Sequence, residues 1–160
     1  MLVANWKMNG SKSLLLEWIE VIGSSLGGDE EQNLIFCPPA CYLSIASDLI
    51  NKRNLNIKLG AQDIDPDLET SLTGGINGSM LRDLGCKYVI IGHSERRIFY
   101  KEDDKLILSK LNSASSENLH IIYCIGETQK EKETGQTFLS LKRQLDVIAE
   151  SSARNYSIAY

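Results

Sequence analysis

The amino-acid sequence predicts a parallel α/β fold, and among such folds it favours a closed (β/α)8 barrel. Short apolar runs alternate with longer helical patterns along the chain, and the connections between them are mostly a few residues long. Residues 88–91 (YVII) form an unbroken aromatic and β-branched run, which is typical of a strand buried on both faces. A (β/α)8 barrel needs about 250 residues. The 160 residues therefore predict about five βα units plus a sixth strand, folded as a single domain over residues 1–160.

In the first half of the chain, strands are predicted at residues 2–6, 34–37 and 57–60, and helices at 13–26, 40–52 and 79–84. The first helix is expected to bury one apolar face, made of Leu14, Leu15, Trp18, Ile19 and Ile22. A Gly-rich acidic connection follows at residues 27–33, and Pro38-Pro39 ends the second strand. Residues 61–78 are polar and rich in Gly and Pro. A loop of this length inside a compact domain is usually functional or contacts a partner.

In the second half, strands are predicted at residues 88–91, 120–124 and 156–160, and helices at 103–117 and 130–150. The helix at 103–117 is expected to turn inward Leu106, Ile107, Leu111 and Ala114. The last helix is expected to be built on Phe138, Leu141, Leu145 and Ile148. A doubly wound sheet is the competing architecture. It would normally have a Gly-rich phosphate turn after the first strand, but the turn here is Lys7-Met8-Asn9-Gly10, which matches neither GxGxxG nor a P-loop.

Composition excludes several function classes. The net charge is -4, and acidic and basic residues are interleaved, so no basic surface for nucleic acid or membranes is expected. The four cysteines show no CxxC pair or zinc spacing, and we expect buried free thiols and no metal site. The first residues show no signal-peptide pattern, and no run is long enough to cross a membrane. A cytoplasmic location is expected.

Polar side chains follow the strands at the ends that share one rim of a parallel barrel. They are Asn5 and Lys7, Gln62 and Asp63, His93, Ser94 and Glu95, and Cys124 and Glu127. A lysine and a neutral histidine at one mouth suit an anionic substrate with a polarisable carbonyl. Taken alone, Lys7 is explained as a solvated loop residue, and Asn5 and Gln62 as caps for backbone groups. Only their joint position favours function.

Five segments carry a resemblance to a known family: NWKMNG (5–10), CPP (37–39), TGG (73–75), IGHSERR (91–97) and CIGET (124–128). Together they resemble the triosephosphate isomerase family, and the resemblance covers the whole chain. It implies a TIM barrel that interconverts dihydroxyacetone phosphate and D-glyceraldehyde 3-phosphate through an enediolate, in glycolysis and gluconeogenesis. It implies no metal and no organic cofactor.

The resemblance also implies roles for single residues. Lys7 would hold the anionic substrate and stabilise the enediolate, with Asn5 beside it. His93 would polarise the substrate carbonyl as a neutral imidazole, and a helix N-terminus directly after it disfavours the imidazolium; the family is established to work with such a neutral histidine and a glutamate base. Ser94, Glu95 and Cys124 would support these groups, with Glu95 near Lys7.

Residues 61–78 are similar to the loop with which the family forms its homodimer, and the resemblance assigns to it Gln62, Thr73, Gly74 and Gly75. The family commonly has Glu where this chain has Gly75, so a contact with Arg96 is in question and a weaker dimer is expected. The last residues resemble the strand before the family's catalytic glutamate and lid. The 160 residues alone are therefore expected to be inactive. Two alternatives remain: a truncated paralogue that acts as a binding or interaction protein, and another barrel that handles phosphosugars.

Overall fold

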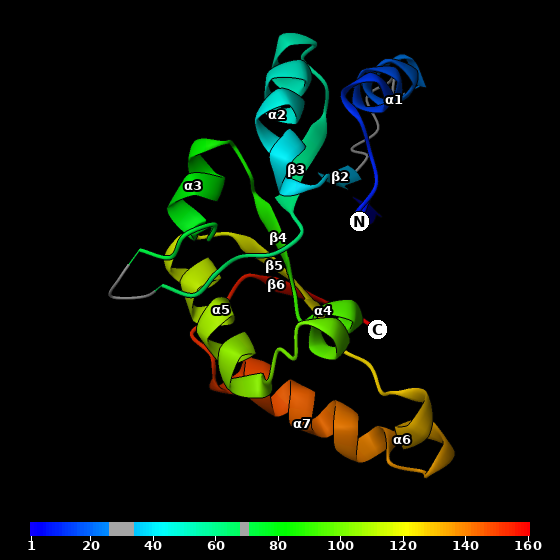
Figure 1. Ribbon diagram of the computed structural model, residues 1–160, viewed down its shortest axis with the longest axis vertical. Coiled ribbons are helices and arrows are strands. Elements are labelled where there is room, and N and C mark those ends of the chain that lie inside the picture. Colours follow the sequence, from blue (N-terminus) through cyan, green and yellow to red (C-terminus); the bar gives the residue numbers. More distant parts are fainter. Residues whose placement is uncertain (26–33, 68–70) are drawn as a thin grey trace. The chain divides into compact units, whose positions relative to one another are not determined.

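The computed structural model describes residues 1–25, 34–67 and 71–160 (Figure 1). The chain divides into two compact units. The first unit contains residues 1–62 and 80–88, and the second contains residues 63–79 and 89–160. The described residues form six strands in the order β1-β2-β3-β4-β5-β6, so the order in the sheet is the order in the chain. The predicted parallel α/β class is confirmed, whereas a single domain over residues 1–160 stays a prediction.

In the first unit, the elements are β1 (Leu2–Asn5), α1 (Lys12–Ser25), β2 (Leu34–Cys37), the 3-10 turn η1 (Ala40–Tyr42), α2 (Leu43–Lys52) and β3 (Ile57–Ala61). β2 pairs in parallel with both β1 and β3. Phe36 is fully buried and stacks on Trp18, with the two ring centroids 4.1 Å apart. Trp6 meets Phe36 edge-on at 4.9 Å. These aromatic contacts hold the end of β1 against α1, because each ring buries a large apolar area.

In the second unit, the elements are β4 (Tyr88–Ile91), which starts at the last residue of the first unit, α4 (Ser94–Phe99), α5 (Asp104–Ser116), β5 (His120–Cys124), α6 (Gln129–Glu133), α7 (Thr137–Glu150) and β6 (Tyr156–Ala159). The short helix α3 (Gly78–Asp83) spans the boundary between the units. β5 and β6 pair in parallel, and α5 packs on both β5 and α7 (Figure 1). Val89, Ile90 and Ile91 are buried, as the apolar run predicted.

Most predicted elements are confirmed, and β2, β4 and β5 have the predicted first and last residues. The prediction of a single helix over residues 130–150 is wrong. The structure has two helices there, separated by residues 134–136. Gly135 has φ +70°, a conformation that suits glycine at the end of a helix. Thr128 and Glu131 cap the N-terminus of α6 reciprocally, so this helix begins at Gln129. The predicted connection at residues 27–33 lies outside the described residues.

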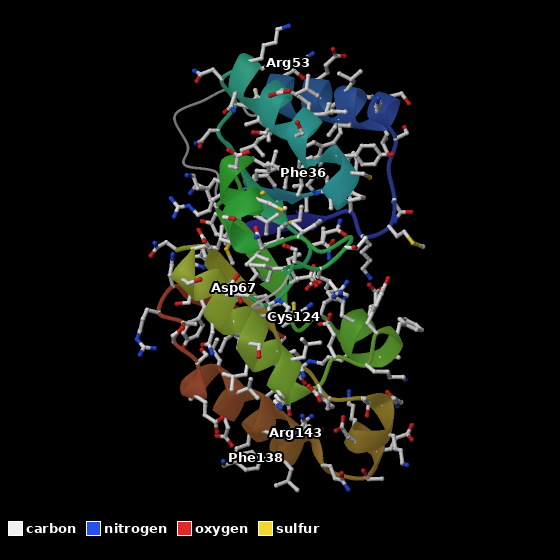
Figure 2. The ribbon with its side chains drawn as sticks, turned by 60° about the vertical axis from the view of Figure 1, so that its left-hand side comes forward. Phe36, Arg53, Asp67, Cys124, Phe138 and Arg143 are labelled. Atoms are coloured by element: carbon white, nitrogen blue, oxygen red, sulfur yellow. The ribbon has the colours of Figure 1, made fainter. Side chains whose placement is uncertain are left out.

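Some side chains that were predicted to lie in the core are exposed instead. Phe138 lies on α7 (Figure 2). It is 74% exposed, and Leu14 and Leu145 are exposed as well. The face of α7 that is buried carries Ser140, Gln144, Val147 and Ile148. Polar Gln144 is buried because its side-chain amide exchanges two hydrogen bonds with the backbone of Gly126, at 2.8 and 3.0 Å. Apolar periodicity therefore located this helix but not its inner face.

The cysteines are all free, but they are not all buried as predicted. Cys37 and Cys86 are buried, Cys124 is half-buried, and Cys41 is exposed. Burial raises the pKa of both Cys37 and Cys86 to about 12. These two thiols are consequently protonated and inert at neutral pH.

Candidate active site

In the first unit, Lys7 lies just after β1 in a left-handed backbone conformation, with φ +52°. This conformation is uncommon for a lysine. Two side-chain amides hold it. The Asn5 side-chain oxygen accepts the backbone N–H of Lys7 at 2.9 Å, and Gln62 Nε2 donates to the Lys7 carbonyl at 3.0 Å. Gln62 Nε2 also donates to the carbonyl of Cys37 at 2.9 Å. A strained residue held from both sides is typical of a functional position.

In the second unit, His93 is the N-cap of α4 and follows directly after β4. Its Nδ1 accepts the backbone N–H of Glu95 at 3.3 Å. An Nδ1 that accepts this bond has no proton of its own, which leaves Nε2 as the nitrogen that can donate a hydrogen bond. The Glu95 carboxylate lies 3.5 Å from the same nitrogen and would be the partner of a protonated Nδ1.

A pocket of about 210 Å³ lies at the ends of β4, β5 and β6. His93, Ser94, Arg97, Cys124 and Tyr160 are among the residues that line it. Pockets for drug-sized ligands measure roughly 300 to 1,000 Å³. A volume of about 210 Å³ therefore suits a small substrate. The pocket therefore brings together His93, the predicted electrophile, with Ser94 and Cys124, which were predicted to support it. Glu95, which was also predicted to support it, follows Ser94 in α4.

Two residues of this pocket were missed as site residues by the sequence analysis. Arg97 was included only in the segment IGHSERR and received no role of its own, yet its side chain is 16% exposed. Burial raises the pKa of Cys124, and the charge of Arg97 opposes that rise. The Tyr160 hydroxyl donates to the Glu127 carboxylate at 3.2 Å, and the negative charge of Glu127 raises the pKa of Tyr160. The arginine pair in IGHSERR was the only sequence signal for Arg97.

The segment predicted to form a dimer is closed at its base within the second unit. The backbone N–H of Asp65 donates to the carbonyl of Ile76 at 2.9 Å, and the N–H of Ile76 donates to the Asp65 carboxylate at 2.8 Å. Thr73 and Gly74 form the turn inside this closure, and the N–H of Gly75 donates to the carbonyl of Leu72. Gly74 has φ +82°. These bonds define the segment's base, and its role in a dimer stays a prediction.

Arg96 finds its carboxylates within its own chain, although Gly75 supplies none. Its guanidinium pairs with Asp63 at 2.7 Å and with Glu102 at 2.8 Å. Lys110 joins the same group, 2.8 Å from Asp63 and 2.7 Å from Glu102. We call Asp63, Arg96, Glu102 and Lys110 the charge quartet. Two cations and two carboxylates leave it neutral, which is the arrangement that buried charges require.

The predicted site residues are therefore divided between the units. Asn5, Lys7 and Gln62 lie in the first, and His93, Ser94, Glu95 and Cys124 lie in the second. Their convergence on one substrate stays a prediction. Within residues 1–25, 34–67 and 71–160, no group of three or more His, Cys, Asp or Glu side chains is placed to hold a metal ion. None of the helices described is long and apolar enough to cross a membrane.

Comparison with known proteins decides the family. The family model for triosephosphate isomerase matches residues 1–160. The chain belongs to the triosephosphate isomerase family. It is similar to the crystal structure of triosephosphate isomerase from Bartonella henselae, with a TM-score of 0.87 and 36% identity over 99% of this chain and 66% of that one. The predicted (β/α)8 barrel fold is thereby confirmed for the part that this chain contributes.

Curated relatives give the same family and show how much of it the chain spans. Triosephosphate isomerase of Vibrio cholerae is 35% identical over 149 residues, which are 93% of this chain and 58% of the relative. That of Photorhabdus laumondii is 38% identical, over 92% of this chain and 57% of the relative. The chain thus spans a little under three fifths of these two relatives.

Proposed function

We propose that the protein is a triosephosphate isomerase, which interconverts dihydroxyacetone phosphate and D-glyceraldehyde 3-phosphate. The observation that carries the proposal is the hydrogen bond from the Glu95 N–H to His93 Nδ1, which leaves Nε2 as a donor at a small pocket, in a chain that matches this family over its whole length. The Nε2–H group of a neutral imidazole can donate a hydrogen bond to a carbonyl oxygen and so polarise the carbonyl. A cytoplasmic location is part of the proposal, and the inert free thiols of Cys37 and Cys86 support it.

The reaction moves one proton between neighbouring carbons and needs no oxidant. His93 donates a hydrogen bond from Nε2 to the carbonyl oxygen, which makes the adjacent C–H more acidic. A carboxylate base takes that proton, and the electron pair forms an enediolate. The base then returns a proton to the neighbouring carbon while His93 moves a proton between the two oxygens. The Lys7 ammonium opposes the negative charge, and Asn5 holds the backbone of Lys7 in place.

We further propose that these 160 residues alone do not catalyse the reaction. The family places its glutamate base, lid and phosphate loops beyond the segment that this chain matches. The chain spans 58% of the Vibrio cholerae enzyme, which supports this view. A base must lie within hydrogen-bond reach of the proton that it removes, so its loss cannot be offset by the remaining groups. Turnover by the purified chain near that of a complete enzyme would refute the proposal.

A chimera tests the isomerase function. Residues 1–160 would be followed by the third of the Bartonella henselae enzyme that lies outside the structural match. We expect triose phosphate isomerisation by the chimera. His93→Gln and Lys7→Met should each reduce kcat/KM by about 100-fold or more. Lys142→Met is the control, because this residue forms an exposed pair with Asp146 on α7. A folded chimera without activity, or variants as active as the control, would contradict the proposal.

The whole protein is also proposed to form a homodimer through the second unit. Ile98, Phe99 and Tyr100 stand together at the end of α4 and are 48, 74 and 70% exposed. Three adjacent exposed apolar side chains are typical of a protein contact. Sedimentation of the chimera should give a dimer, and Phe99→Ser should shift it toward monomer without loss of helicity. A monomeric chimera at micromolar concentration would contradict this.

The same apolar side chains favour a second candidate, a binding or interaction protein. This function requires the chain to be folded by itself. A cooperatively folding, monodisperse chain of 160 residues, together with an inactive chimera, would favour the binding protein over the isomerase.

A further inference from the structure

We propose that Arg97 is the residue that positions His93. The side chain of Arg97 reaches back to the turn between β4 and α4, where its Nε donates to the carbonyl of Gly92 at 3.0 Å. That carbonyl belongs to the peptide plane that also contains the backbone nitrogen of His93. Fixing this plane fixes one side of the His93 backbone.

The other side of His93 is fixed by the same short helix. Its carbonyl accepts the backbone N–H groups of Arg96 at 2.9 Å and of Arg97 at 3.2 Å. Both peptide planes at the His93 Cα are therefore held by residues 96 and 97. The direction of the Cα–Cβ bond follows from these two planes, so the imidazole can swing only about its side-chain torsions. The bond from Glu95 N–H to Nδ1 restrains those torsions.

The turn also leaves no room to replace Gly92. This residue has φ +78°, which favours glycine. An added Cβ would lie 3.0 Å from the Cys124 carbonyl and 3.1 Å from a guanidinium nitrogen of Arg97. Arg97 is thus packed directly against the turn. A close fit of this kind transmits any displacement of the guanidinium to the peptide before His93.

Arg97 is itself anchored to two further elements. Its NH1 donates to Asp104 of α5 at 3.0 Å, and its NH2 lies 3.3 Å from the Tyr123 hydroxyl of β5. The planar guanidinium can serve three acceptors in fixed directions, which the single ammonium of a lysine cannot do with the same geometry. The arginine therefore ties the turn to α5 and β5, and the position of His93 depends on both of these elements.

The test uses the 160-residue chain labelled with ¹⁵N-histidine. The chain has two histidines, and His93→Gln assigns the signals. In the unchanged chain, His93 should show one neutral tautomer with its proton on Nε2. In Arg97→Met, the ring should mix both tautomers, because its turn is no longer held. The matched control is Arg143→Met, since Arg143 also pairs with Asp104 but has no bond to Gly92.

If Arg97→Met does not fold, Arg97→Lys provides the measurement. It keeps the charge, and we expect it to fold but still to give mixed His93 tautomers. The proposal is overturned if a folded variant of Arg97 leaves the His93 signals unchanged. It is also overturned if the unchanged chain already mixes tautomers, or if Arg143→Met changes the signals as much.

The consequence for catalysis rests on the proposed function and is measured separately in the chimera. There, Arg97→Lys should lower kcat by roughly 10- to 100-fold while KM stays within about threefold, because a misplaced electrophile affects the transition state most. If the chimera is inactive before any substitution, the isomerase proposal fails, and the tautomer of His93 still decides the role of Arg97. If kcat stays unchanged in Arg97→Lys, positioning by Arg97 is refuted.

Discussion

Replacing Lys110 with methionine is expected to lower the free energy of unfolding by about 3 to 5 kcal/mol. The Lys110 side chain is 2% exposed, and its ammonium donates to both Asp63 oxygens at 2.8 Å and to Glu102 at 2.7 Å. Without it, two carboxylates share one cation, Arg96. Glu102 is 3% exposed, so water cannot offset the excess negative charge. The magnitude is that of breaking a buried ion pair by removing one partner.

The charge balance predicts a specific rescue. Asp63→Asn in the Lys110→Met background restores neutrality, because Glu102 and Arg96 remain as one pair at 2.8 Å. The double variant should therefore lose less stability than the sum of the two single variants, with an interaction of about 1 to 3 kcal/mol. The loss in Lys110→Met should also shrink at lower pH. Burial already raises the pKa of Asp63, and removing Lys110 takes away the strongest influence that opposes the rise.

Urea unfolding followed by circular dichroism measures these differences. Lys142→Met is the control. This lysine forms an exposed i,i+4 pair with Asp146 on α7, and pairs of that kind contribute about 0.3 to 0.5 kcal/mol. If Lys110→Met costs no more than Lys142→Met at neutral pH, the charge quartet does not stabilise the fold and the reasoning is wrong. If the double variant is simply additive, charge balance is not the cause.

Three further predictions follow from single groups. Hydrogen bonds from the Ser140 hydroxyl and from the backbone N–H and hydroxyl of Thr128 lower the pKa of Glu131 to about 2. Its cap on α6 should therefore be complete above pH 4.5 and be lost as the pH falls toward 2; amide NMR of α6 should show this, and Glu131→Gln should remove the pH dependence. Near pH 8, a thiol reagent followed by mass spectrometry should modify exposed Cys41 first, whereas Cys37 and Cys86 should react only after unfolding. Lys7→Gly should raise stability by about 1 kcal/mol in urea unfolding, because glycine adopts a positive φ without strain, while the chimera loses activity; lower stability would contradict the strain at this position.

Much of the fold could be predicted because each strand has a local cause. The run at residues 88–91 is apolar throughout, and Pro38-Pro39 ends β2 where it was expected to end. The break between α6 and α7 was also present in the sequence, as Gly135. It was missed because the apolar periodicity of α7 was extended backward through this glycine to residue 130.

The inner face of α7 could not be predicted in the same way. Periodicity places Phe138 and Leu145 on an apolar stripe, yet the structure buries Gln144. The reason is a backbone need elsewhere, since Gly126 requires both a donor and an acceptor, and a buried glutamine amide supplies them. Such a requirement belongs to the tertiary structure and leaves no pattern in the helix itself.

The groups expected to do chemistry were predicted by motif, whereas the residues that hold them were not. In each unit, a residue with positive φ ends the strand segment, Lys7 after β1 and Gly92 after β4. A left-handed residue turns its carbonyl away from the regular pairing of the sheet, so that carbonyl needs a donor from elsewhere. Gln62 supplies it to Lys7, and Arg97 supplies it to Gly92.

Both donors are planar groups with several N–H bonds, and each joins more than one element. A group with one donor could satisfy the carbonyl but could not also fix its direction relative to a second strand or helix. Because polar side chains hold the carbonyls of these turns, we expect a substitution at Gln62 or Arg97 to displace a predicted site residue while the strands and helices stay intact. Site geometry in this chain is therefore separable from fold stability, and the two have to be measured by different experiments.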